Sequence, residues 1–210
     1  KLLHNTILKN IDMKNTALIL IGYQNDYFAK DGILTSVIEE SANTNKCLEN
    51  TLNVLDFSSK SNMLAISTPI IFTEGYKELV QPAGILKTIK DVEAFKSGEK
   101  GSKVIPEVLK YGDSVLEIPG KRGLNAFSNT KLDEILNKNN IENLVMLGVV
   151  SSVCIDSTAR SAFELGYHVT ILSDCTAGRT TFEQDYYCEN IFPIYANVID
   201  HKTFLSQIKS

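Results

Sequence analysis

The chain has 210 residues, of which 43% are hydrophobic and 22% charged, and its formal net charge is −4. This length and apolar content suit a single α/β domain over residues 1–210 with a core of its own. The acidic balance offers no basic surface for phosphates, so we do not expect nucleic acid as a partner. No apolar run approaches the roughly 20 residues of a membrane-spanning helix, and no signal-peptide-like segment opens the chain. We therefore expect a cytoplasmic protein that does not bind membranes.

The cysteines and histidines indicate neither a redox motif nor a metal centre. The four cysteines have no CxxC spacing, so reduced thiols are expected rather than a zinc ribbon. The three histidines form no HxxxH or HxH pattern, which argues against a histidine-rich metal site. The four cysteines are Cys47, Cys154, Cys175 and Cys188. The sequence predicts no metal and no cofactor.

Short apolar runs alternate with longer amphipathic stretches along the chain. Strands are predicted at 17–21, 69–72, 114–118, 144–148, 168–172 and 196–199, and helices at 37–60, 131–137, 154–165 and 182–190. Strands that are apolar along their whole length belong in a parallel sheet covered on both faces. The sequence thus predicts a three-layer α/β/α domain with a six-stranded, mostly parallel sheet and an active site at the carboxyl ends of the strands. The long polar stretch 75–112 predicts a helix-containing excursion over that site.

Cys154 has the most informative position among the cysteines. It follows a predicted buried strand and opens an amphipathic helix that Ser151 or Ser152 can cap. In the first turn of such a helix, exposed N–H groups stabilise a thiolate and can bind a developing oxyanion. Position alone fits a small buried thiol about equally well, and for the other three cysteines this is the preferred interpretation.

A resemblance to a known family strengthens the first interpretation. Residues 148–162 resemble the nucleophile segment of the isochorismatase-like hydrolases, and residues 165–174 resemble the strand that follows it. That superfamily includes nicotinamidases, carbamoyl-group hydrolases and isochorismatases. The resemblance implies Cys154 as nucleophile, oxyanion-binding N–H groups at 151–154, and a non-proline cis peptide between Val150 and Ser151. It also implies a homo-oligomer.

A second similar segment lies upstream, at residues 111–127, and resembles the family's stretch that ends in Ala-Phe. Counting back from Ala126 and Phe127 places the family's catalytic lysine at Lys121. Its ammonium would hold the thiolate and orient the substrate carbonyl. A lone lysine is far more often a solvated surface residue, but the spacing to Ala126 favours the site. Phe127 is either a core residue or a wall of the pocket.

The first predicted strand and its continuation, residues 17–28, closely resemble the family's "ID-x-QNDF" signature, with one departure. Gly22 stands where the family has the aspartate that takes the thiol proton and returns it to the leaving group. Glu74 is a candidate substitute base, because it follows a strand expected beside the first one. Asp26 is a second candidate, although its equivalent in the family looks structural. The resemblance places Gly22 and Phe28 in the pocket.

The expected function is hydrolysis of a small amide, imide or carbamoyl compound through a cysteine thioester. Without a base at residue 22, Lys121 and the helix terminus would have to ionise the thiol unaided. The alternatives are a catalytically impaired member that binds or regulates through a small molecule, and an isochorismatase-type hydrolase. Cleavage of a vinyl ether is less expected, because it relies on the missing aspartate. Residues 73–79 contain no histidine, so the family's metal site and nicotinamidase activity are not predicted.

Overall fold

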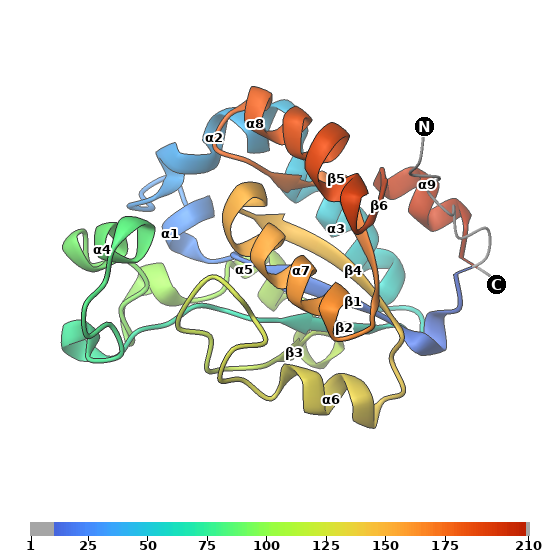
Figure 1. The fold of residues 1–210 in the computed structure, drawn as a ribbon, viewed down its shortest axis with the longest axis horizontal. Helices are drawn as coiled ribbons and strands as arrows, with labels where there is room; N and C mark the ends of the chain where they lie inside the picture. The colour runs from blue at the N-terminus through green and yellow to red at the C-terminus, as the bar shows by residue number, and fades with distance from the viewer. Residues whose placement is uncertain (1–10, 209–210) are drawn as a thin grey trace.

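A six-stranded parallel sheet forms the middle layer of the protein, as the computed structural model of the chain shows for the described residues, 11–208 (Figure 1). Its order is β3-β2-β1-β4-β5-β6, and every neighbouring pair is parallel. The strands are β1 (Thr16–Ile21), β2 (Leu64–Ser67), β3 (Leu116–Glu117), β4 (Asn143–Val149), β5 (His168–Ala177) and β6 (Asn197–Ile199). The predicted three-layer α/β/α class is confirmed.

Helices cover both faces of the sheet and its carboxyl edge. The α-helices are α1 (Asn25–Phe28), α2 (Thr35–Thr44), α3 (Cys47–Ser58), α4 (Gly84–Asp91), α5 (Pro106–Leu109), α6 (Leu132–Lys138), α7 (Asp156–Glu164), α8 (Thr181–Tyr186) and α9 (His201–Ser206). Two π-helices, η5 (Ser151–Ile155) and η6 (Tyr187–Ile191), adjoin α7 and α8. Short 3₁₀ turns are η1 (Met13–Asn15), η2 (Glu74–Tyr76), η3 (Lys100–Ser102), η4 (Gly112–Ser114) and η7 (Phe192–Ile194). No helix among residues 11–208 is long and apolar enough to cross a membrane.

Alternation along the buried strands divides the core into two clusters. Because successive side chains of a strand point to opposite faces, Ala17, Ile19 and Ile21 join the cluster under α6 and α7. Leu18 and Leu20 join the cluster under α3, α5 and α9. The two clusters bury nearly all of β1 and β4, which explains why the sequence shows continuous apolar runs there rather than alternation.

Two predicted elements differ from the structure. The second strand is β2, at 64–67, and the predicted run 69–72 forms only isolated bridges, from Ile70 to Lys121 and from Phe72 to Lys96. Pro69 at its start has no N–H to donate to a ladder. The predicted helix 37–60 is two helices, because Lys46 adopts a left-handed backbone conformation with φ 57° between α2 and α3.

The polar excursion at 75–112 contains α4 and α5, and a third buried cluster joins it to the carboxyl edge of the sheet. In this cluster Ile89 and Phe95 from the excursion pack with Tyr27 after β1 and with Val149 and Val150 at the end of β4. The excursion therefore covers the end of the sheet where ligands bind in open α/β folds.

Candidate active site

Cys154 lies in the π-helix η5, directly after β4, and is 6% exposed. The N–H groups of Val153 and Ile155 both donate to the Val150 carbonyl, at 3.0 and 3.2 Å. The turn places the sulfur at the carboxyl edge of the sheet, as predicted from the sequence. The non-proline cis peptide joins Val149 to Val150, one bond earlier than the resemblance implied.

Neither serine before Cys154 caps a helix. The buried Ser151 hydroxyl donates to Gln184 Oε1 of α8 at 2.5 Å, and the Ser152 hydroxyl donates to Glu183 of the same helix. The π-helix η5 has no side-chain cap at its start. Both serines therefore fasten the nucleophile segment to α8.

Lys121 is 1% exposed and its ammonium lies against the cysteine. Its Nζ is 3.4 Å from Cys154 Sγ and donates to the Gly123 carbonyl at 2.5 Å. A buried ammonium is costly unless it is paired, and a thiolate at this distance supplies an opposite charge. The structure brings together Cys154 and Lys121, the two residues to which the family resemblance gave catalytic roles.

The loop that carries Lys121 is tied to the nucleophile helix. The Ala126 N–H donates to Thr158 Oγ1 of α7 at 3.0 Å, and the Asn125 amide donates to Ser161 Oγ at 2.7 Å. These two bonds fix the loop over the first turns of α7, which holds the Lys121 ammonium in place beside the sulfur.

Gly22 is buried at the end of β1, beside β4, and has φ 77°. A Cβ atom at this position would meet Val149 Cγ2 at 2.7 Å and the Val149 carbonyl oxygen at 2.8 Å. No side chain fits there without a shift of the backbone, because real Cβ atoms do not approach other atoms so closely. Residue 22 thus offers no carboxylate, and the backbone around it leaves no room for a Cβ atom.

The remaining signature residues hold the excursion. Gln24 is buried and bonds both the N–H and the carbonyl of Ile70, and it also donates to the Ser102 carbonyl. Asn25 donates to the Lys100 carbonyl. The carboxylate of Asp26 accepts the Phe95 N–H at 2.6 Å, and Gly101 leaves the space that this carboxylate fills. Asp26 is therefore engaged as a structural acceptor.

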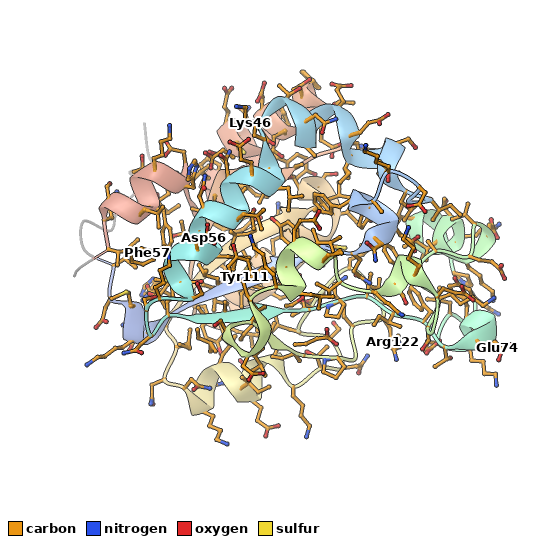
Figure 2. All side chains as sticks on the ribbon, turned by 180° about the vertical axis from the view of Figure 1, so that it is seen from behind. Lys46, Asp56, Phe57, Glu74, Tyr111 and Arg122 are labelled. Atoms are coloured by element: carbon orange, nitrogen blue, oxygen red, sulfur yellow. The ribbon has the colours of Figure 1, made fainter. Side chains whose placement is uncertain are left out.

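Glu74 is exposed and lies at the periphery of the molecule, and the structure does not bring it to the buried pair (Figure 2). A second glutamate four residues later, Glu78, contacts the loop that carries Lys121. Glu78 Oε1 accepts from Arg122 Nε at 3.1 Å and from the Thr73 N–H at 2.9 Å. Burial acts to raise the pKa of Glu78, but the Thr73 and Arg122 contacts outweigh it and lower that pKa.

Tyr27 is the residue of the site that the sequence did not single out. It is buried, and its Cδ2 atom would lie 3.5 Å from a Cβ at Gly22. Burial, together with the negative charges that Cys154 and Asp26 can carry, raises the pKa of Tyr27 far above its ordinary value. The phenol therefore stays protonated at neutral pH. Its position after Asp26 in the signature was the available signal.

The two phenylalanines assigned to the pocket pack against aromatic rings. Phe28 stacks on Tyr23 with ring centroids 5.1 Å apart. Phe127 stacks on Tyr167, the residue before β5, with centroids 6.1 Å apart, and packs against the cluster under α7. Of the two alternatives for Phe127, this contact favours a core residue.

Comparison with known proteins identifies the family of the chain. A model of the isochorismatase domain matches residues 16–203. The chain belongs to the isochorismatase family. Three solved structures with a similar fold illustrate the range of enzymes that the chain is similar to. A cysteine hydrolase from Pseudomonas syringae has a TM-score of 0.78 and 17% identity, over 94% of this chain and 93% of that one.

The other two structures are amidases by description. N-carbamoylsarcosine amidase from Thermoplasma acidophilum has a TM-score of 0.69 and 18% identity, over 89% of this chain and 96% of that one. Nicotinamidase from Bacillus subtilis has a TM-score of 0.66 and 20% identity, over 89% and 99%. At such identities the likeness establishes a common fold, and function has to be argued from the site.

Proposed function

We propose that this isochorismatase-family chain hydrolyses a small amide, imide or carbamoyl compound through a thioester on Cys154. The observation that carries the proposal is the 3.4 Å contact between Lys121 Nζ and Cys154 Sγ in a buried setting. A thiol becomes a strong nucleophile when it ionises, and an adjacent cation favours the thiolate. The amidases that share the fold support a C–N bond as the target.

In the proposed reaction the Cys154 thiolate attacks the substrate carbonyl carbon, forming a C–S bond and an oxyanion. The Val153 N–H is already bonded to Val150, so the N–H groups of Ser151, Ser152 and Cys154 are the candidates for binding that oxyanion. Collapse breaks the C–N bond, and the departing nitrogen takes its proton from a water molecule. Water then cleaves the thioester, releasing the acid and the thiol.

The Cys154 thiol has to lose its proton without the help of a carboxylate at residue 22. Because its pKa is raised, Tyr27 stays neutral and cannot act as the base that removes the thiol proton. Ionisation of Cys154 therefore rests on Lys121 and on the helix terminus.

The proposal is tested by trapping the acyl-enzyme. The protein is mixed with a panel of small amides, imides and carbamoyl compounds, quenched in acid, and examined by intact-protein mass spectrometry while release of amine is followed. We expect an acyl adduct that maps to Cys154, is absent from Cys154→Ala, and persists in the matched variant Cys188→Ala. Equal amine release by Cys154→Ala would overturn the proposal.

A second candidate function is ligand binding without turnover. The closed space at Gly22 supports it, because residue 22 offers no carboxylate to carry a proton and a Cβ atom there would overlap Val149. The same panel separates the two candidates. Thermal stabilisation by a compound that is neither cleaved nor attached to Cys154 would favour a binding protein.

A further inference from the structure

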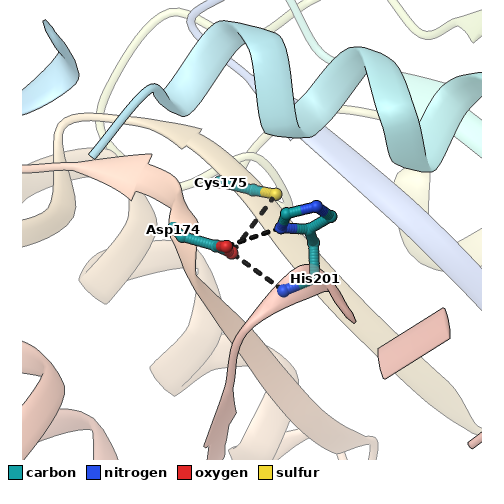
Figure 3. A group of neighbouring side chains, drawn as sticks. All are labelled: Asp174, Cys175 and His201. Atoms are coloured by element: carbon teal, nitrogen blue, oxygen red, sulfur yellow. Dashed lines mark hydrogen bonds and ion pairs between the residues drawn. The ribbon is translucent and has the colours of Figure 1, made fainter. Parts of the chain in front are cut away.

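A second cysteine with ionisable neighbours lies on the other side of the sheet, where Asp174, Cys175 and His201 converge (Figure 3). His201 Nδ1 is 2.5 Å from Asp174 Oδ2, and Cys175 Sγ is 3.8 Å from Asp174 Oδ1. One ligand atom from each residue lies within 4.8 Å of the other two. Cys175 and His201 are buried, whereas Asp174 reaches a cavity.

A bulge in β5 makes this convergence possible. Met146 pairs with Ile171, but Gly148, only two residues later, pairs with Thr176, so β5 has extra residues between these pairs. Consecutive side chains of a regular strand point to opposite faces, and bulges re-aim them. In this bulge the Asp174 carboxylate and the Cys175 sulfur lie side by side, although the two residues are consecutive.

The third residue comes from the start of α9. The backbone N–H of His201 donates to Asp174 Oδ1 at 2.8 Å, and Asp200 caps the helix by accepting the Thr203 N–H. These bonds hold the imidazole over the bulge. His201 and Cys175 thus lie close together although they are 26 positions apart in the sequence. No step of the proposed hydrolysis uses them.

We propose that Asp174, Cys175 and His201 bind a divalent transition-metal ion of the zinc type. Sulfur, imidazole nitrogen and carboxylate oxygen together are donors that Zn²⁺ accepts in proteins. A thiolate and a carboxylate also neutralise the charge of the ion, which reduces the cost of holding it in a buried place. The ion replaces the thiol proton, which leaves to solvent, and it takes the place of the hydrogen bond between Asp174 and His201, with the neutral imidazole bearing its proton on Nε2.

The surroundings leave a place for a fourth ligand. A cavity of about 480 Å³ opens beside the cluster and is lined by Asp174 and His201 together with Asn45, Glu49 and Asp200. The buried Oδ1 of Asn45 has no hydrogen-bond partner among residues 11–208. Three protein ligands and a water from this cavity would complete a tetrahedral ion.

The test uses Co²⁺ as a spectroscopic probe on the full chain, freed of metal by a chelator. Because Cys154 could itself bind the probe, every arm carries Cys154→Ser. We expect one Co²⁺ per chain, with the near-ultraviolet absorption of a thiolate-cobalt bond, and displacement by Zn²⁺. Adding Cys175→Ser should abolish this absorption and weaken Zn²⁺ binding by at least about 100-fold, whereas adding Cys188→Ser should change neither.

His201→Gln is a second test of the metal site, because it removes the imidazole ligand and leaves the buried sulfur in place. It tests the proposal even if Cys175→Ser fails to fold. It should weaken Zn²⁺ binding by at least about tenfold. Absence of the thiolate-cobalt absorption in the Cys154→Ser protein would overturn the proposal, and so would its survival in folded Cys175→Ser. The outcome is independent of whether the chain hydrolyses amides.

Discussion

The end of β4 and the bulge of β5 each bury a cysteine, but the two thiols have different neighbours. Cys154 is in contact with the Lys121 ammonium. Cys175 is wholly buried, and burial raises its pKa far above the ordinary value, with further contributions from Cys47 and Asp174. The partner of a buried thiol thus decides its chemistry. A cation favours a free thiolate, whereas acidic and imidazole neighbours suit a thiolate that a metal holds.

The largest effect is expected from Lys121→Met, which removes the group that sets Cys154 apart. Without the ammonium, the thiolate and the oxyanion lose their opposite charge, so turnover of an amide substrate should fall by about 100- to 1,000-fold. Alkylation of Cys154 by iodoacetamide near neutral pH should slow as well. Both rates are measured on the same preparations.

Arg122→Gln is the matched control for that change. Arg122 is the next cation along the chain, and it pairs with Glu78 at a partly exposed position. Its loss should leave the alkylation rate of Cys154 within about twofold, because a partly exposed ion pair contributes little. Equal slowing by both variants would mean that Lys121 has no special role.

The four thiols should also separate by their reactivity across pH. Burial raises the pKa of Cys188 to about 12, with Asp185 and Glu189 adding to it, so at pH 8 on the order of one Cys188 in ten thousand is a thiolate. We expect iodoacetamide to modify Cys154 first near neutral pH, and Cys188 only as the pH rises toward 12. Peptide mapping gives the order, and equally rapid labelling of Cys188 at pH 8 would remove the distinction.

The sequence predicted the layers from local patterns, because continuous apolar runs indicated the central strands. It predicted the pair of Lys121 and Cys154 from the resemblance of two segments to a known family, and the structure places the two side chains in contact. The second strand was misplaced, because 69–72 is apolar but begins with a proline that cannot join a ladder. Composition does not reveal such hydrogen-bond registers.

Two features of the sites depended on tertiary contacts that no local pattern carries. Glu74 was a reasonable substitute base while its strand was expected beside β1, but it is exposed at the periphery. The cluster at Asp174 was hidden because the bulge changes which side chains share a face, and because His201 is far along the chain. The histidine spacing therefore gave no sign of a metal site.

A smaller but well-controlled effect concerns the closed space at Gly22. Gly22→Ala should lower the free energy of unfolding by about 2–4 kcal/mol, from the left-handed backbone and from overlap with Val149. Gly75 has nearly the same φ, 75°, but nothing within 4 Å of a Cβ, so Gly75→Ala should cost only about 1–2 kcal/mol. Urea denaturation measures both. Equal losses would show that Val149 yields easily and that a side chain at residue 22 can be accommodated.

The smallest effects concern the link between the two cysteine regions. Gln184 accepts from Ser151 beside the nucleophile and donates to the carbonyl of Ser173, next to the bulge residue Asp174. Ser151→Ala leaves the buried Oε1 of Gln184 without this donor and should destabilise the fold by about 1–2 kcal/mol.

Ser152→Ala is the matched variant, because the partner of Ser152, Glu183, is also bound by the Arg179 guanidinium at 2.6 Å. Its carboxylate keeps a donor when the hydroxyl is lost, so the cost should stay below about 1 kcal/mol. Urea denaturation of both variants gives the difference. If Ser151→Ala lowers the free energy of unfolding no more than Ser152→Ala does, Gln184 does not hold the nucleophile segment to the bulge. The two cysteine regions would then not be coupled through Gln184.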